Sequence, residues 1–104
     1  MDKNKQERLE AAGWTVAGPK EFLNLTDEDE AYIEVKMALA AAVKALRLGQ
    51  ELSQVEAAGR LRSSQSRVAK MEAADRSVSV DLLVRAFLKL GGTRATLLEA
   101  LRLE

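Results

Sequence analysis

The chain has neither cysteine nor histidine among its 104 residues. Without cysteine it can form no disulfide framework and no thiolate nucleophile. Without histidine it lacks the commonest general base and the commonest transition-metal ligand. The acidic residues that remain gather at expected helix starts, where capping and the helix dipole already account for them. We therefore expect no catalytic residues, no metal site and no cofactor, and predict that the protein is not an enzyme.

Long apolar runs are also missing. The longest, Met37 to Val43, has seven residues, mostly alanine, and is far too short to cross a bilayer. The first ten residues are charged, unlike the apolar core of a signal peptide. These features predict a soluble, cytoplasmic protein without a membrane partner.

Aromatic residues make up only 4% of the chain and proline occurs once, whereas hydrophobic residues reach 47%. Most of these are alanine and leucine, which favour helices as the abundant glutamate, lysine and arginine do. The apolar content is too high for a disordered chain, and the length suits one domain. The composition therefore predicts an all-α domain with a real core.

Helix starts and stops punctuate the chain from Thr26 onward. Thr26 with Asp29, and Ser53 with Glu56, have the spacing of capping boxes. Gly49 is expected to end the first long helix, whose apolar pattern includes Tyr32, Val35, Leu39, Val43 and Leu46. Ser64, Ser79 and Thr93 are further expected caps, and Gly91-Gly92 a further stop. The predicted helices cover residues 27–48, 54–61, 65–73, 80–90 and 94–104.

Residues 1–25 differ from the rest and are predicted to form a short N-terminal extension to a domain over 26–104. A short helix is expected from Lys5 to Ala12, before a stretch punctuated by two glycines and the only proline. Trp14 either anchors this arm on the core or is exposed as a partner-binding residue. Phe22 is the second partner-binding candidate.

The charge is zero overall but unevenly distributed. Residues 1–43 have a net charge of −4 and residues 44–104 one of +4. The segment 60–71 contains four cations and no acid: Arg60, Arg62, Arg67 and Lys70. Such a stripe is either a polyanion-binding surface or an ordinary solvated helix face.

The two short helices predicted over 54–61 and 65–73, about three residues apart, match a helix-turn-helix unit between Leu52 and Glu72. In such a unit the first helix braces against the DNA backbone, and the second presents its first residues to base edges. Ala57 and Ala58 are small enough for the helix crossing. The second helix opens with polar residues: Gln65, Ser66 and Arg67.

Leu52-Ser53-Gln54 through Gly59-Arg60-Leu61, followed by Ser64 through Met71-Glu72, resembles the Cro/repressor-type (XRE) helix-turn-helix, and the segment from Ser79 to Gly91 resembles the next family helix. The resemblance covers roughly residues 36–91 and implies a five-helix, lambda-repressor-like domain. Family members usually carry glycine where this chain has Arg62. Either the turn differs locally, or Arg62 is retained because it helps hold a phosphate.

The resemblance also implies DNA-binding roles for eight residues. Gln65 and Arg67 would read bases, since glutamine pairs with adenine and arginine with guanine. Gln54 would touch a phosphate and the recognition helix, and Ser64 would cap that helix and meet a phosphate. Ser66 and Lys70 would contact the backbone or flanking bases, and Arg60 and Arg62 would contact phosphates. Alternatively, Gln54 is a simple helix-start residue, and Arg60 and Lys70 are solvated. Glu72 is expected to pair with a neighbouring cation.

These roles predict a sequence-specific transcriptional repressor. One short recognition helix buries little surface, so a homodimer on a palindromic operator in double-stranded DNA is expected. The apolar stripe of the last helix is a candidate dimer surface, or else packs within the monomer: Leu97, Leu98 and Leu101.

The N-terminal part is similar to the extensions of HigA-type antitoxins, whose partners are basic RelE/HigB-like ribonuclease toxins. An acidic N-terminal half would complement such a partner. The resemblance therefore implies the antitoxin of a toxin–antitoxin pair that represses its own operon. A stand-alone regulator, and a helical protein-interaction module without DNA binding, are the alternatives.

Overall fold

The computed structural model describes residues 25–102. This part of the chain is all-α, with five helices and no strand. Each helix agrees with its prediction to within about two residues. The expected helix at 5–12, Trp14 and Phe22 lie outside the described residues. The five helices are α3 (Asp27–Gly49), α4 (Gln54–Leu61), α5 (Gln65–Glu72), α6 (Val80–Lys89) and α7 (Arg94–Arg102).

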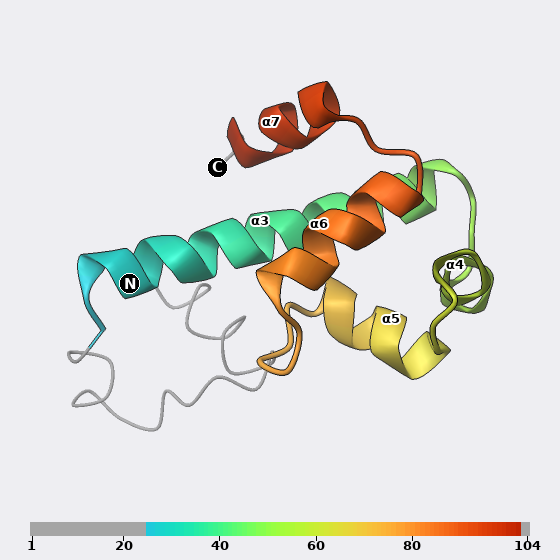
Figure 1. Cartoon of the computed structure of the whole chain (residues 1–104), viewed down its shortest axis with the longest axis horizontal. Coiled ribbons are helices and arrows are strands. Elements are labelled where there is room, and N and C mark those ends of the chain that lie inside the picture. Colours follow the sequence, from blue (N-terminus) through green and yellow to red (C-terminus); the bar gives the residue numbers. More distant parts are fainter. Residues whose placement is uncertain (1–24, 103–104) are drawn as a thin grey trace.

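Helix α3 is the longest and forms the axis around which the other helices are arranged (Figure 1). It packs against α5, α6 and α7, while α4 packs against α5 and α6. Helices α4 and α5 lie to one side of α3, and α7 lies on the opposite side (Figure 1). The end of the bundle that carries α4 and α5 is therefore not covered by α7.

Hydroxyl side chains begin the helices as the sequence predicts. Ser64 Oγ accepts from the Arg67 amide at 3.1 Å, and Ser79 Oγ accepts from the Leu82 amide at 3.1 Å. Thr26 and Ser53 form complete capping boxes with Asp29 and Glu56. Thr93 and Thr96 bond each other's backbone amides at the start of α7. Because these contacts are local, sequence spacing alone sets where each helix starts.

Left-handed residues follow the helix ends. Glu51, Arg62 and Ala74 have φ values of 57°, 54° and 53°, and Gly91 has a φ of 100°. The first helix ends at Gly49 as expected, but the left-handed position falls on Glu51. The idea that the turn at Arg62 differs locally is wrong, since Arg62 adopts the conformation that favours glycine. That backbone costs a non-glycine residue about 1 kcal/mol.

The apolar pattern predicted for α3 is buried only in part. Leu39 and Val43 are 2% and 0% exposed, whereas Tyr32 and Val35 are 50% and 43% exposed. The face that packs inward carries Ile33, Lys36 and Val43, and Lys36 is only 3% exposed. Because Lys36 is charged, a pattern built from apolar residues alone does not identify it as a residue of the inner face.

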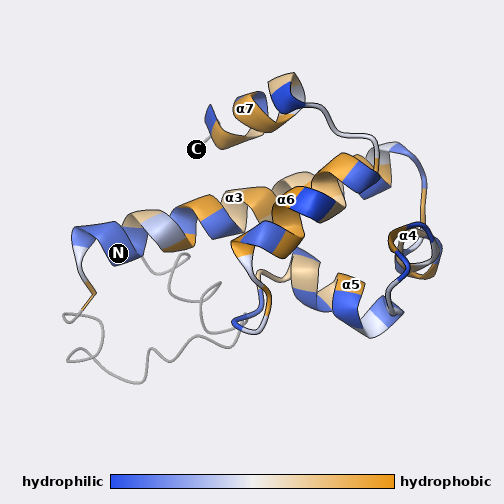
Figure 2. Cartoon of the chain, viewed as in Figure 1, coloured by the Kyte–Doolittle hydropathy of each residue, from blue (hydrophilic) through white to orange (hydrophobic). Residues whose placement is uncertain are grey.

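The core is built mainly from aliphatic side chains at the centre of the bundle. Val68 and Met71 of α5 belong to this core and are each 1% exposed. They join Leu39 of α3 with Leu83 and Phe87 of α6 in one apolar cluster. The first turn of α3, which carries four acids, is hydrophilic (Figure 2). None of the helices between residues 25 and 102 is long and apolar enough to span a membrane.

Candidate nucleic-acid interface

Helix α5 is anchored on its inner face and polar at its start. Three residues, 62–64, connect it to α4. Val68 and Met71 fix it to the core, while Ser64, Gln65, Ser66 and Arg67 are all exposed. The first turn contains no acidic residue. The unpaired amides of a helix start carry partial positive charge, so this end favours an anionic partner.

Gln54 connects the starts of the two helices. Its Oε1 accepts a hydrogen bond from Gln65 Nε2 at 2.7 Å, and its own Nε2 donates to Glu72 Oε1 at 3.2 Å. Gln54 therefore contacts both ends of α5, as the resemblance to the repressor-type unit implies. The interpretation of Gln54 as a residue that merely starts a helix does not account for these contacts.

Glu72 belongs to an ion pair with Arg47 of α3. Arg47 Nε donates to Glu72 Oε2 at 2.5 Å and its Nη2 donates to Oε1 at 2.9 Å. The two side chains are 9% and 5% exposed. The hydrogen bonds to Glu72 raise the pKa of the Arg47 guanidinium above its ordinary value. The expected cation partner of Glu72 is thus a residue 25 positions earlier in the chain, which spacing within α5 could not identify.

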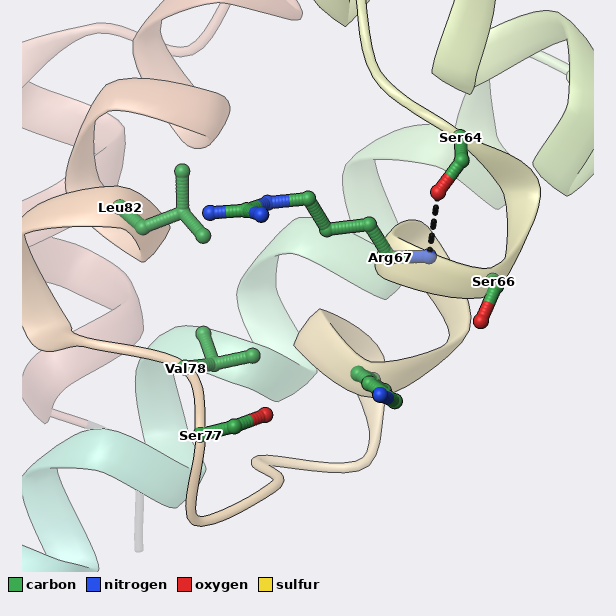
Figure 3. A pocket seen from close by; sticks show the side chains of 7 residues that line it. Ser64, Ser66, Arg67, Ser77, Val78 and Leu82 are labelled. Carbon is green, nitrogen blue, oxygen red and sulfur yellow. Dashed lines mark hydrogen bonds between the residues drawn. The ribbon is translucent and has the colours of Figure 1, made fainter.

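A hollow of about 340 Å³ lies between α5 and the start of α6 (Figure 3). The Arg67 side chain extends from α5 across the hollow toward Leu82 (Figure 3). Four predicted DNA-binding residues therefore share one concave surface with three residues that sequence reasoning missed. The hollow is lined by Ser64, Ser66, Arg67, Lys70, Ser77, Val78 and Leu82.

Two of the missed residues, Ser77 and Val78, come from the segment that joins α5 to α6, and Leu82 lies in the first turn of α6. Ser77 donates hydrogen bonds from its amide and its hydroxyl to Asp75 Oδ1, at 2.9 and 2.6 Å. These bonds lower the pKa of the Asp75 carboxyl below its usual 3.8. The Asp-x-Ser spacing directly after a helix is a turn signal that could have marked this segment. Its place beside Arg67 depends on tertiary packing.

The remaining predicted cations lie apart from the hollow. Arg60 Nη1 donates to Gln50 Oε1 at 3.0 Å, and Gln50 Nε2 donates to the Leu90 carbonyl at 2.6 Å. Arg60 is therefore directed toward the turn between α3 and α4. Arg62 is exposed in the turn between α4 and α5.

The chemistry of the hollow suits an anionic, hydrogen-bonding partner. Arg67 and Lys70 supply two cations, and three serines supply hydroxyls that donate or accept. No acidic side chain lines it. Between residues 25 and 102 no group of acidic side chains is arranged to hold a metal ion. Phosphate oxygens and base edges are partners of the kind that these groups bind.

The last helix bears the residues predicted for dimer formation. Leu97 is half-buried against the core, whereas Leu98 and Leu101 are 62% and 39% exposed. Helix α7 buries no residue completely and packs on α3, away from α5. The structure thus divides the predicted stripe into one residue that packs within the monomer and two that face outward.

A family model described as a helix-turn-helix domain matches residues 22–95. The match includes all of α3 to α6 and hence every residue that forms the hollow. It applies to helix-turn-helix domains in general, so the narrower Cro/repressor-type assignment stays a prediction. Comparisons with curated proteins and with solved structures gave no match.

Proposed function

The chain belongs to the helix-turn-helix domain family, and from this premise we propose that it is a sequence-specific transcriptional repressor that binds double-stranded DNA through α5. The observation that carries the proposal is the exposed start of α5 beside a hollow lined by serines and two cations. Helix-turn-helix proteins insert this part of the second helix into the major groove.

In this proposal some polar residues at the start of α5 contact bases and others contact the DNA backbone. Gln65 and Arg67 reach base edges, where an amide matches adenine and a guanidinium matches guanine. Ser64, Ser66 and Lys70 contact the sugar–phosphate backbone on either side, together with Gln54 and the turn residue Arg62. Backbone contacts position the protein and supply affinity, while the two base contacts supply specificity. Arg60, held by Gln50, contributes to affinity through its charge.

We propose that the repressor binds as a homodimer. Helix α5 has eight residues, and a single helix of this length buries too little surface for tight specific binding. Leu98 and Leu101 are exposed on α7, on the opposite side of α3 from α5. A dimer formed through α7 would leave both recognition helices accessible to DNA. The expected operator is palindromic, because a twofold protein presents two identical reading surfaces.

Selection from a library of random DNA duplexes tests the proposal. The expected result is an inverted repeat whose half-sites lie about 10 base pairs apart, or a multiple of that distance. The double variant Gln65→Ala/Arg67→Ala should lose the enrichment while keeping its helical circular dichroism. A protein-interaction module without DNA binding would enrich no sequence, and that result would refute the repressor.

An antitoxin role is the more specific candidate. The first turn of α3 carries four acids, and Asp27, Glu28 and Asp29 are exposed. A basic ribonuclease toxin of the RelE/HigB type would be attracted to such a surface. The other proposed partner-binding residues, Trp14 and Phe22, lie outside the described residues. Co-expression with the adjacent reading frame should yield a stable complex. If the two proteins purify separately, the antitoxin role is excluded and the stand-alone regulator is favoured.

A further inference from the structure

One hydrogen-bond chain runs from the interior of the bundle to the start of α5. It begins at the Arg47 guanidinium, passes through the Glu72 carboxylate and the Gln54 amide, and ends at the Gln65 amide. The inner ion pair is almost fully buried, while Gln65 is exposed. Its outermost member is therefore one of the two proposed base-reading residues, and its innermost members have no access to DNA.

The Glu72 carboxylate determines which groups donate and which accept along this series of hydrogen bonds. An ionised carboxylate only accepts hydrogen bonds, so Gln54 must turn its Nε2 toward Glu72. The Oε1 of Gln54 then faces Gln65, and accepts from Gln65 Nε2 at 2.7 Å. Gln65 is left with its Oε1 and its second N–H for a ligand. The orientation of the Gln65 amide thus depends on that of Gln54. The orientation of Gln54 depends on Glu72, because a carboxylate can only accept and so requires the NH₂ group of Gln54 to face it.

We infer that the carboxylate of Glu72 fixes which way Gln65 presents its amide to DNA, and thereby makes adenine the preferred base at one position of each half-site. An oxygen and an N–H presented side by side complement the N6 amino group and N7 of adenine. Glu72 and Arg47 are then positioning residues for base recognition, although neither touches DNA. This inference rests on the proposed DNA-binding function.

The substitution Glu72→Gln keeps the size and shape of the side chain but replaces a group that only accepts hydrogen bonds with one that also donates. The new amide can offer Gln54 its nitrogen, in which case Gln54 and Gln65 both turn over. Gln65 would then present its NH₂ group outward, which suits acceptors such as guanine O6 or thymine O4. The preference for adenine over the other bases should fall from about tenfold or more to about twofold or less at that position. The position read by Arg67 should keep its preference.

Two further variants separate positioning from stability. Gln54→Ala interrupts the chain near the surface and should relax the adenine preference in the same way, and it decides the question if Glu72→Gln does not fold. Val43→Ala creates a cavity in the core at a residue that is 0% exposed. It should lower the melting temperature and leave all base preferences unchanged.

The measurement is competition between duplexes that differ at one base pair, taken from the sequences that the wild-type protein selects. Loss of the adenine preference in Glu72→Gln and Gln54→Ala, but not in Val43→Ala, supports the inference. An adenine preference that survives either substitution in a folded protein overturns it and leaves the DNA-binding function intact. The same holds if the wild-type protein selects its sequence with no adenine-specific position that responds to Gln65→Ala. Failure of the wild-type protein to select any sequence removes the proposed function itself.

Discussion

Arg47 near the end of α3 and Glu72 at the end of α5 form a two-point ion pair across 25 residues of chain. Arg47 also donates to the Leu52 carbonyl at 2.8 Å, at the entry to α4. The pair therefore ties α5 to α3, the longest helix of the bundle, and to the entry of α4. Burial makes the pair costly to break, because a lone charge would be left out of water.

Arg47→Met should lower the free energy of unfolding by about 3 kcal/mol, since it leaves the Glu72 carboxylate buried without its cation. The double variant Arg47→Met/Glu72→Met should recover most of that loss, because no uncompensated charge remains. Urea unfolding followed by circular dichroism measures the double variant and the two single variants, Arg47→Met and Glu72→Met. If the double variant is as unstable as the sum of the two single variants, the two residues are not coupled.

The sequence predicted the local features of this fold well. Helix starts depend on a hydroxyl and an acid three residues apart, and both capping boxes lie where that spacing places them. The polar start of α5 was predicted from its cap Ser64 and from the residue types that follow it: Gln65, Ser66 and Arg67. The partner of Glu72, and the lining of the hollow by Ser77 and Leu82, depend on contacts between distant segments. No spacing rule within one helix contains that information.

Arg62→Gly should stabilise the protein by about 1 kcal/mol, because glycine adopts the left-handed conformation found there without the steric cost that arginine pays. The same substitution should weaken DNA binding if Arg62 holds a phosphate, and should lower the slope of log affinity against log salt by about 1. Thermal unfolding and fluorescence anisotropy measure the two effects. A variant that is more stable and binds DNA with an unchanged salt slope would show that Arg62 does not contact the backbone.

Lys36 is a buried charge on the inner face of α3. Burial lowers its pKa below the usual 10.5, and the negative charge of Asp75 partly opposes this shift. Just below pH 10.5 the unfolded chain therefore holds this proton while the folded one has begun to lose it, so the Lys36 contribution makes stability rise with pH in that window. Lys36→Met removes the titrating group, so the stability of this variant should lack the Lys36 contribution to the rise with pH in that window. Urea titrations of both proteins at pH 7, 9 and 10 measure this; a Lys36→Met protein whose stability changes with pH as the wild-type protein's does would contradict the lowered pKa of Lys36.

Leu98→Glu/Leu101→Glu should convert a dimer to a monomer, because it places four carboxylates in an interface that would otherwise bury four leucines. Sedimentation equilibrium should show the change, and operator affinity should fall by at least tenfold as one half-site is lost. Leu88→Glu is the matched control, since Leu88 is similarly exposed on α6 at 47%. A wild-type protein that is monomeric at high micromolar concentration would exclude this interface.

The most direct test of DNA binding through α5 is the salt dependence of affinity for the selected duplex, measured for the wild-type protein, Arg67→Ala and Arg85→Ala. Arg85 is an equally charged, exposed residue of α6, bonded to Asp81 outside the hollow. The expected result is a steep fall in affinity with salt for the wild-type protein and Arg85→Ala, and at least tenfold weaker, less selective binding for Arg67→Ala. Equal affinity and selectivity of all three proteins would contradict the assignment of α5 as the DNA-reading helix.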